Sequence, residues 1–146
     1  MRVSLLDVNM LIALAWPSHI HHIQAHTWFA KNASSGWATC PITQCAFVRI
    51  SSNPKIIPEA VSPGEALELL GQIISQKHHK FWPDDIPLLG KYLPDKLLVG
   101  HRQITDAYLL GLAIKNEGKL VTLDKGISSL ISSKSPHQGT LEIVGR

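Results

Sequence analysis

The stretch LLDVNMLIAL (residues 5–14) places an acidic residue between two apolar runs. Burying an unpaired charge is costly, so Asp7 requires a partner or a metal ion. The apolar residues at 2–6 predict a short buried strand, and the residues after Asp7 predict a short helix that ends at Pro17. Asp7 therefore stands where the first strand ends.

Strands and helices alternate along the rest of the chain. Apolar runs predict further strands at residues 36–40, 79–82, 119–124 and 140–144. Helical periodicity and capping residues predict helices at residues 18–34, 41–51, 64–76, 83–93 and 104–118. This alternation is typical of an α/β fold in which helices cover both faces of a parallel sheet. No segment has the composition of a linker, so we expect residues 1–146 to form one domain.

Particular side chains are expected to set helix boundaries and faces. Ser18 is the expected N-cap of the second helix, Asp84 or Asp85 that of the helix at 83–93, and Gly118 the stop after residues 104–118. The expected apolar stripe of the second helix is Ile20, Ile23, Thr27 and Ala30.

Composition limits the class of protein. Hydrophobic residues make up 45% of the chain and charged residues 17%, which is typical of a globular protein. The net charge of +3 permits an anionic partner but does not require one. Cys40 and Cys45 match no zinc or redox spacing, so we expect both to be reduced core residues of a cytoplasmic protein. No apolar run is long enough to cross a membrane.

Polar residues from four segments are expected at one edge of the sheet. Ligands of parallel sheets collect at the carboxyl ends of the strands. Asp7 and Asp124 each end a strand there, and Asp106 lies in the first turn of a helix that starts nearby. Gln44, early in the helix after the second strand, and Asn9 should lie close to them.

Three carboxylates held together repel one another, and a divalent cation removes that repulsion. Oxygen ligands suit Mg²⁺ or Mn²⁺ rather than zinc. Such an ion can activate water and stabilise a departing oxygen, which is the chemistry of phosphodiester hydrolysis. Each acid also has a purely structural explanation. Asp7 could cap a helix, Asp106 could serve the helix dipole, and Asp124 could start the turn LDKG.

The segments LLDVNMLIAL, WATCPITQCAFVRIS and GHRQITDAYLLGLAIKNEGKLVTLD resemble, in order and spacing, the PIN-domain ribonucleases, and most closely the VapC toxins of toxin–antitoxin pairs. The resemblance implies a three-layer α/β/α fold with a central, mainly parallel sheet. It also implies RNA cleavage that depends on Mg²⁺ or Mn²⁺, a homodimer, and inhibition by a cognate VapB-like antitoxin.

By position, the resemblance assigns Asp7, Asp106 and Asp124 as catalytic, metal-binding acids. Gln44 occupies a place where the family usually has Glu, so the chain loses one charge there. Asn9 and Thr122 match supporting positions. A catalytically weak PIN-like module that binds RNA or a partner is therefore the main alternative, and Gln44 favours it.

Other sequence features compete with this interpretation. His101 and Arg102 precede the site helix and could contact a phosphate or simply lie in an exposed loop. His22 and His26 invite a zinc hypothesis, but no third ligand is evident, which favours a solvated or RNA-facing surface. A haloacid-dehalogenase-type phosphatase needs a second Asp where this chain has Asn9. A receiver domain needs an early acid pair and a central Asp that are not evident.

Overall fold

The computed structural model describes residues 2–93, 97–132 and 134–145. Its strands form one parallel sheet in the order β3-β2-β1-β4-β5. The strands are β1 (Ser4–Leu6), β2 (Trp37–Thr39), β3 (His79–Phe81), β4 (Lys119–Thr122) and β5 (Leu141–Ile143). The expected parallel α/β sheet is confirmed, although each of the five strands is shorter than the apolar run that predicted it.

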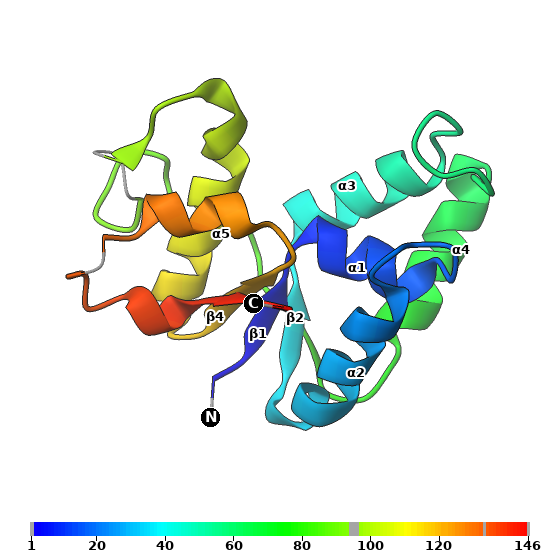
Figure 1. The fold of residues 1–146 in the computed structure, drawn as a ribbon, viewed down its shortest axis with the longest axis horizontal. Helices are drawn as coiled ribbons and strands as arrows, with labels where there is room; N and C mark the ends of the chain where they lie inside the picture. The colour runs from blue at the N-terminus through cyan, green and yellow to red at the C-terminus, as the bar shows by residue number, and fades with distance from the viewer. Residues whose placement is uncertain (1, 94–96, 133, 146) are drawn as a thin grey trace.

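Helices cover both faces of this sheet and complete a three-layer α/β/α architecture. Helix α5 lies on one side, while α1, α2 and α4 lie on the other (Figure 1). The helices are α1 (Val8–Ala15), α2 (His22–Asn32), α3 (Pro41–Ser51), α4 (Pro63–Ile74) and α5 (Ile104–Lys115). No helix in the described part of the chain is long and apolar enough to span a membrane.

The alternation of side chains along the strands builds two apolar cores. Leu5 and Leu120 pack with the apolar residues of α5, whereas Leu6 and Val121 pack with those of α1 and α2. Successive strand residues point to opposite faces of a sheet, which explains why adjacent leucines enter different cores. β1 is buried at every position, as the opening sequence stretch predicts.

The second helix begins later than expected. Residues 17–21 form turns, and α2 starts at His22, while the Ser18 hydroxyl donates to the Glu59 carboxylate. The predicted stripe is wrong, because Ile20 is 89% exposed and Ile23 is 79% exposed. Ala25 and Trp28 form the buried face instead. The inward face is the one whose residues, Ala25 and Trp28, pack into the core with α1.

Residues 83–93 do not form a helix. Pro87 in the middle of this segment lacks an N–H and restricts the preceding residue, which disfavours helix formation. Asp84 and Asp85 therefore cap nothing, and Asp85 instead pairs with Lys115 of α5 at 2.6 Å.

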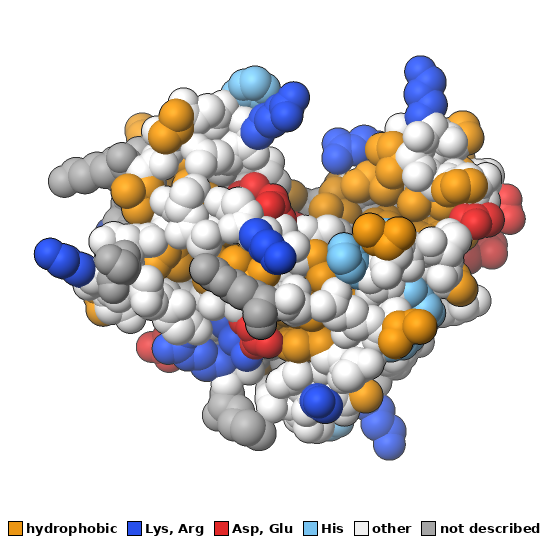
Figure 2. Space-filling model, in the orientation of Figure 1, with side chains coloured by type: hydrophobic (Ala, Val, Ile, Leu, Met, Phe, Trp, Pro, Cys, Tyr) orange, Lys and Arg blue, Asp and Glu red, His pale blue; other side chains and the backbone are white. Residues whose placement is uncertain are grey.

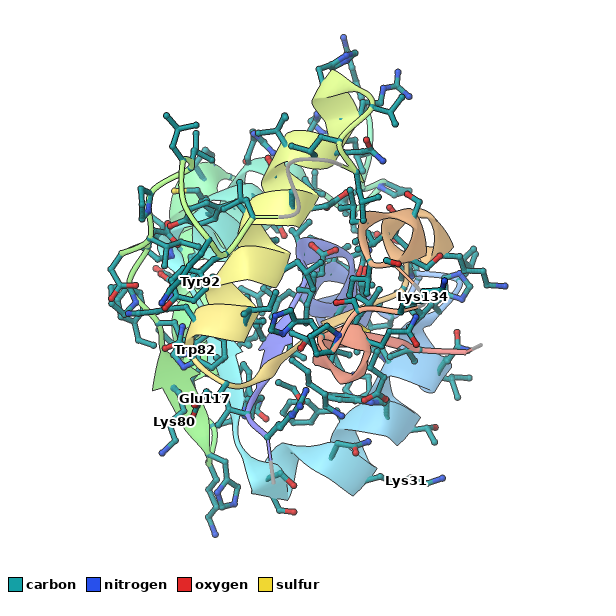
Figure 3. All side chains as sticks on the ribbon, turned by 90° about the vertical axis from the view of Figure 1, so that its left-hand side faces the viewer. Lys31, Lys80, Trp82, Tyr92, Glu117 and Lys134 are labelled. Atoms are coloured by element: carbon teal, nitrogen blue, oxygen red, sulfur yellow. The ribbon has the colours of Figure 1, made fainter. Side chains whose placement is uncertain are left out.

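Helix α5 ends at Lys115, three residues before the expected glycine. Glu117 adopts the left-handed conformation, with φ of 55°. The N–H of Gly118 donates to Ala113 O and that of Glu117 to Ile114 O, which is a Schellman motif. Position 118 requires glycine because there is no room for a side chain, not because of its backbone conformation. A Cβ there would lie 2.5 Å from Val3 O and 2.6 Å from the Trp82 ring. Trp82 and Glu117 lie at the same end of α5 (Figure 3).

We expect Gly118→Ala to destabilise the fold by about 1–3 kcal/mol, because the added methyl group meets a main-chain carbonyl and an indole. Gly71→Ala is the matched control. Gly71 lies within α4 with nothing within 4 Å of its Cβ direction, so this change should stabilise by roughly 0.5–1 kcal/mol. Urea unfolding of both variants measures the difference, and equal unfolding midpoints would contradict the packing described at Gly118.

Candidate active site

Asp7 lies at the carboxyl edge of the sheet, where β1 pairs with β4. Its N–H donates to Val121 O at 2.9 Å and continues the strand register by one residue. The side chain is 5% exposed. The Val8 N–H and the Thr122 hydroxyl each donate to its carboxylate at 2.8 Å. Asp7 is therefore a fixed carboxylate, and it also caps α1, as its structural alternative predicted.

Thr122 connects the polar groups around Asp7. It is fully buried, and its hydroxyl, which donates to Asp7, accepts from Asn9 Nδ2 at 2.9 Å and from the Asp124 N–H at 3.0 Å. Asn9 Oδ1 accepts from the Leu123 N–H at 3.0 Å. Thr122 and Asn9 thus tie the start of α1 to the end of β4 and fix how Asp7 and the Asp124 backbone lie relative to one another.

The three aspartates are close enough to influence one another electrostatically. Asp106 lies in the first turn of α5 and is half-buried. Burial raises its pKa to about 6, with smaller contributions from the negative charges of Asp7 and Asp124. Burial also raises the pKa of Asp7, against the hydrogen bonds from Thr122 and Val8, and Asp124 adds to the increase. Three distant chain segments therefore place their acids in one neighbourhood.

These acids do not yet form a set of ligands. Within the described part of the chain, no three His, Cys, Asp or Glu side chains are arranged to hold one metal ion. The exposed Asp124 accepts from the Gly126 N–H at 2.8 Å, as its turn-forming alternative predicted. No hydrogen bond joins Asp106 to another described side chain. Binding one cation would require the side chains of Asp106 and Asp124 to move toward the fixed Asp7.

Gln44 is oriented by a hydrogen-bond chain that reaches β3. Its Nε2 donates to Thr39 Oγ1 at 3.0 Å, and Thr39 Oγ1 lies 2.8 Å from His79 Nε2. Thr39 accepts from the amide, so its hydroxyl hydrogen is free for His79. This arrangement leaves the Gln44 carbonyl oxygen as the group available to other partners. A carboxylate at this position would instead demand the Thr39 hydrogen.

A groove of about 470 Å³ lies between α3 and α4 next to Gln44. The walls of the groove are mostly apolar, and Arg49 contributes a positive charge to them. The lining residues include Pro41, Gln44, Cys45, Val48, Arg49 and Leu67. Figure 2 shows an apolar hollow at the upper right of the molecule, with acidic side chains at its edge. Cys45 is therefore exposed, contrary to expectation, whereas Cys40 is buried. The groove requires α3 and α4 to pack together, which is a tertiary feature that local sequence does not show.

His101 and Arg102 form part of a 3-10 turn, His101–Gln103, that leads directly into α5. Both side chains are exposed. They therefore lie a few residues before Asp106, and their role in binding RNA stays a prediction.

Comparison with known proteins gives the family. The sequence pattern of the PIN domain matches residues 4–130. The chain belongs to the PIN-domain family. Among PIN proteins it is 46% identical over 132 residues to ribonuclease VapC38 of Mycobacterium tuberculosis, covering 90% of this chain and 92% of that protein. Ribonuclease VapC39 of the same organism is 44% identical, covering 89% and 94%. The resemblance to VapC proteins is confirmed.

Solved structures agree with the PIN fold. VapBC2 from Rickettsia felis, crystallised with a DNA fragment from its promoter, aligns with a TM-score of 0.63 at 15% identity and covers 97% of this chain and 98% of that chain. DNA-bound VapBC from Salmonella typhimurium aligns with a TM-score of 0.56 at 17% identity, covering 84% and 87%. At such low identity these matches speak for the fold alone.

The raised pKa of Asp106 predicts a particular pH dependence of stability. An unperturbed Asp has a pKa of 3.8, and burial raises the pKa of Asp106 in the fold to about 6. Between these values the folded chain keeps a proton that the unfolded chain has lost, so stability falls as the pH rises through this window. In EDTA, we expect Asp106→Asn to reduce this fall and to unfold at higher urea than the wild type at neutral pH.

Asp85→Asn serves as the control for this measurement, because Asp85 lies outside the acid cluster and pairs with Lys115. It should retain the wild-type slope. Some slope should also persist in Asp106→Asn, since the pKa of Asp7 is raised in the same direction. Superimposable profiles for wild type and Asp106→Asn would show that the fold does not raise the pKa of Asp106.

Proposed function

We propose that this PIN-family chain is a metal-dependent endoribonuclease and the toxin of a VapBC-type toxin–antitoxin pair, acting in the cytoplasm. The observation that carries the proposal is the convergence of Asp7, Asp106 and Asp124 at the carboxyl edge of the sheet, close enough for their charges to act on one another. A surface that only bound RNA would gain nothing from negative charge where phosphates must approach. Similarity to proteins named as ribonucleases supports the same class of reaction.

Asp7, Asp106 and Asp124 are the residues that we assign to hold Mg²⁺ or Mn²⁺. Their carboxylate oxygens are the hard donors that these ions prefer. The raised pKa of Asp106 supports this assignment, because a cation would relieve the repulsion that helps to raise it. When bound, the ion supplies water activation and charge neutralisation for phosphodiester hydrolysis.

The neighbouring residues of the chain position these acids and the substrate. Thr122 and Asn9 hold Asp7 in one orientation, so the carboxylate does not need to be ordered during the reaction. The Gln44 carbonyl oxygen offers a neutral metal ligand at the position where the family usually has a fourth acid. We assign His101 and Arg102, exposed ahead of α5, to hold the RNA backbone.

The proposed partners are RNA, a VapB-like antitoxin and a second copy of the chain. The structural neighbours from Rickettsia felis and Salmonella typhimurium are VapBC assemblies, which supports an antitoxin partner by analogy. The second candidate function is a PIN-like module that binds RNA or a partner with little or no cleavage. Gln44 favours it, because the amide carries no charge to help retain a cation.

We expect the purified protein to cleave RNA with Mg²⁺ or Mn²⁺ and to lose this activity in EDTA. Asp106→Asn should slow cleavage by roughly 10²–10³-fold, because it removes a charge that stabilises the ion and thus the transition state. Asp85→Asn should cut at the wild-type rate, since this exposed acid pairs with Lys115 instead. The readout is single-turnover cleavage of a labelled RNA, alongside RNA binding by each variant.

The binding-module alternative makes the opposite prediction. If wild type and Asp106→Asn bind RNA equally well, and neither cuts under any of the metal conditions, the nuclease assignment is wrong and the binding module replaces it.

A further inference from the structure

A pair of histidines lies where α1 ends and α2 begins. His22 is the first residue of α2, and His26 follows one turn later. Their ring centroids are 4.4 Å apart, with an interplanar angle of 58°. His22 is partly exposed and His26 is exposed. Histidine side chains lie at the surface over the connection between α1 and α2 (Figure 2). Neither ring has a role in the proposed nuclease site.

Each ring is held by a main-chain carbonyl at the end of α1. His22 Nδ1 lies 2.7 Å from Ala13 O, and His26 Nε2 lies 2.8 Å from Leu14 O. A carbonyl oxygen can only accept a hydrogen bond, so each of these ring nitrogens carries the proton. In a neutral imidazole the other nitrogen then carries a lone pair. The two free lone pairs are therefore on His22 Nε2 and His26 Nδ1.

This arrangement is the one that metal-ligating histidines usually have. Two histidines at i and i+4 present their nitrogens on one face of a helix. A ligating histidine normally donates its second N–H to a carbonyl or carboxylate, which fixes the tautomer and orients the ring. Both conditions hold for His22 and His26 before any ion binds. The sequence alone shows the spacing but not the two carbonyl partners.

We propose that His22 and His26 form a binding site for a divalent transition-metal ion of the nickel, copper and zinc class. Imidazole nitrogen suits these ions, whereas the carboxylates at the sheet edge suit Mg²⁺ or Mn²⁺, so the two sites differ in chemistry. No third His, Cys, Asp or Glu completes the set among the residues that the structure describes. His19 Nδ1 already accepts from the His21 N–H at 3.0 Å. Water therefore fills the remaining coordination positions, which makes the site exchangeable.

An ion at this site would strengthen the contact between α1 and α2. The rings already bond the last carbonyls of α1, and coordination would fix both rings on α2 at once. Since the ion binds the folded chain, it should raise the apparent stability as its concentration increases. This inference is independent of the proposed nuclease function, because it involves neither RNA nor the three aspartates.

The test uses a double variant that keeps the carbonyl bonds but removes the lone pairs. Asn places a donor near the position of Nδ1, and Gln places one near Nε2, so His22→Asn combined with His26→Gln retains both helix contacts. His137→Gln is the control, as it removes an exposed histidine elsewhere in the fold. Zn²⁺ is titrated calorimetrically into each protein with excess Mg²⁺ present to compete at the carboxylates.

Wild type and His137→Gln should bind one more equivalent of Zn²⁺ than the double variant, and only these two should unfold at higher urea when Zn²⁺ is added. In ¹⁵N-resolved spectra of the wild type, Zn²⁺ should shift His22 Nε2 and His26 Nδ1. Equal Zn²⁺ binding by the double variant, or unmoved resonances of these two nitrogens, would overturn the proposal. The spectra of the wild type decide the matter even if the double variant fails to fold.

Discussion

The parallel pairing of β1 with β4 is the constraint on which the rest of the structure depends. Its register places Leu6 opposite Val121, and the next step along each strand brings Asp7 to Thr122. One hydroxyl then joins the start of α1 to the segment that carries Asp124. A shift of this register by one residue would exchange the two cores and separate Asp7 from its donor. Core packing and site geometry are therefore specified together.

The acids at this edge oppose the stability of the fold that carries them. Asp7 is buried and Asp106 is half-buried, and burial raises the pKa of each carboxyl. The charges of Asp7 and Asp124 raise the pKa of Asp106 further, and that of Asp124 adds to the increase at Asp7. The hydrogen bonds from Thr122 and Val8 offset part of this cost for Asp7, whereas no described side chain does so for Asp106. Such a concentration of unfavourable charge is characteristic of functional sites rather than of packing. It agrees with the membership of the chain in the PIN-domain family.

Much of this arrangement could be predicted from local sequence. Apolar runs that end in Asp identified β1 and β4, and the parallel topology then required their acids to share an edge. Boundaries that depend on tertiary contacts were not predictable in this way. The turns at 17–21 moved the start of α2, and Glu117 rather than Gly118 took the left-handed position at the end of α5.

The surroundings of the site were the least predictable part. The orientation of Gln44 depends on Thr39 and on His79, which is distant in the sequence and is brought beside Thr39 by the pairing of β2 with β3. The groove beside it requires α3 and α4 to pack together. The carbonyl partners of His22 and His26 similarly come from another helix. Local patterns identify residue types at an edge, but the partners that orient them come from the assembled fold.

The central claim is that acids from three distant segments share one cation. Anomalous diffraction from a crystal of the protein soaked in Mn²⁺ tests it most directly. The account predicts a manganese peak in contact with carboxylate oxygens of Asp7, Asp106 and Asp124, with Asp7 held in place by Thr122 and the other two side chains turned toward it. The account would be contradicted if no manganese peak lay among the three acids at a saturating Mn²⁺ concentration, with Asp7 and Asp124 still accepting only their N-cap hydrogen bonds.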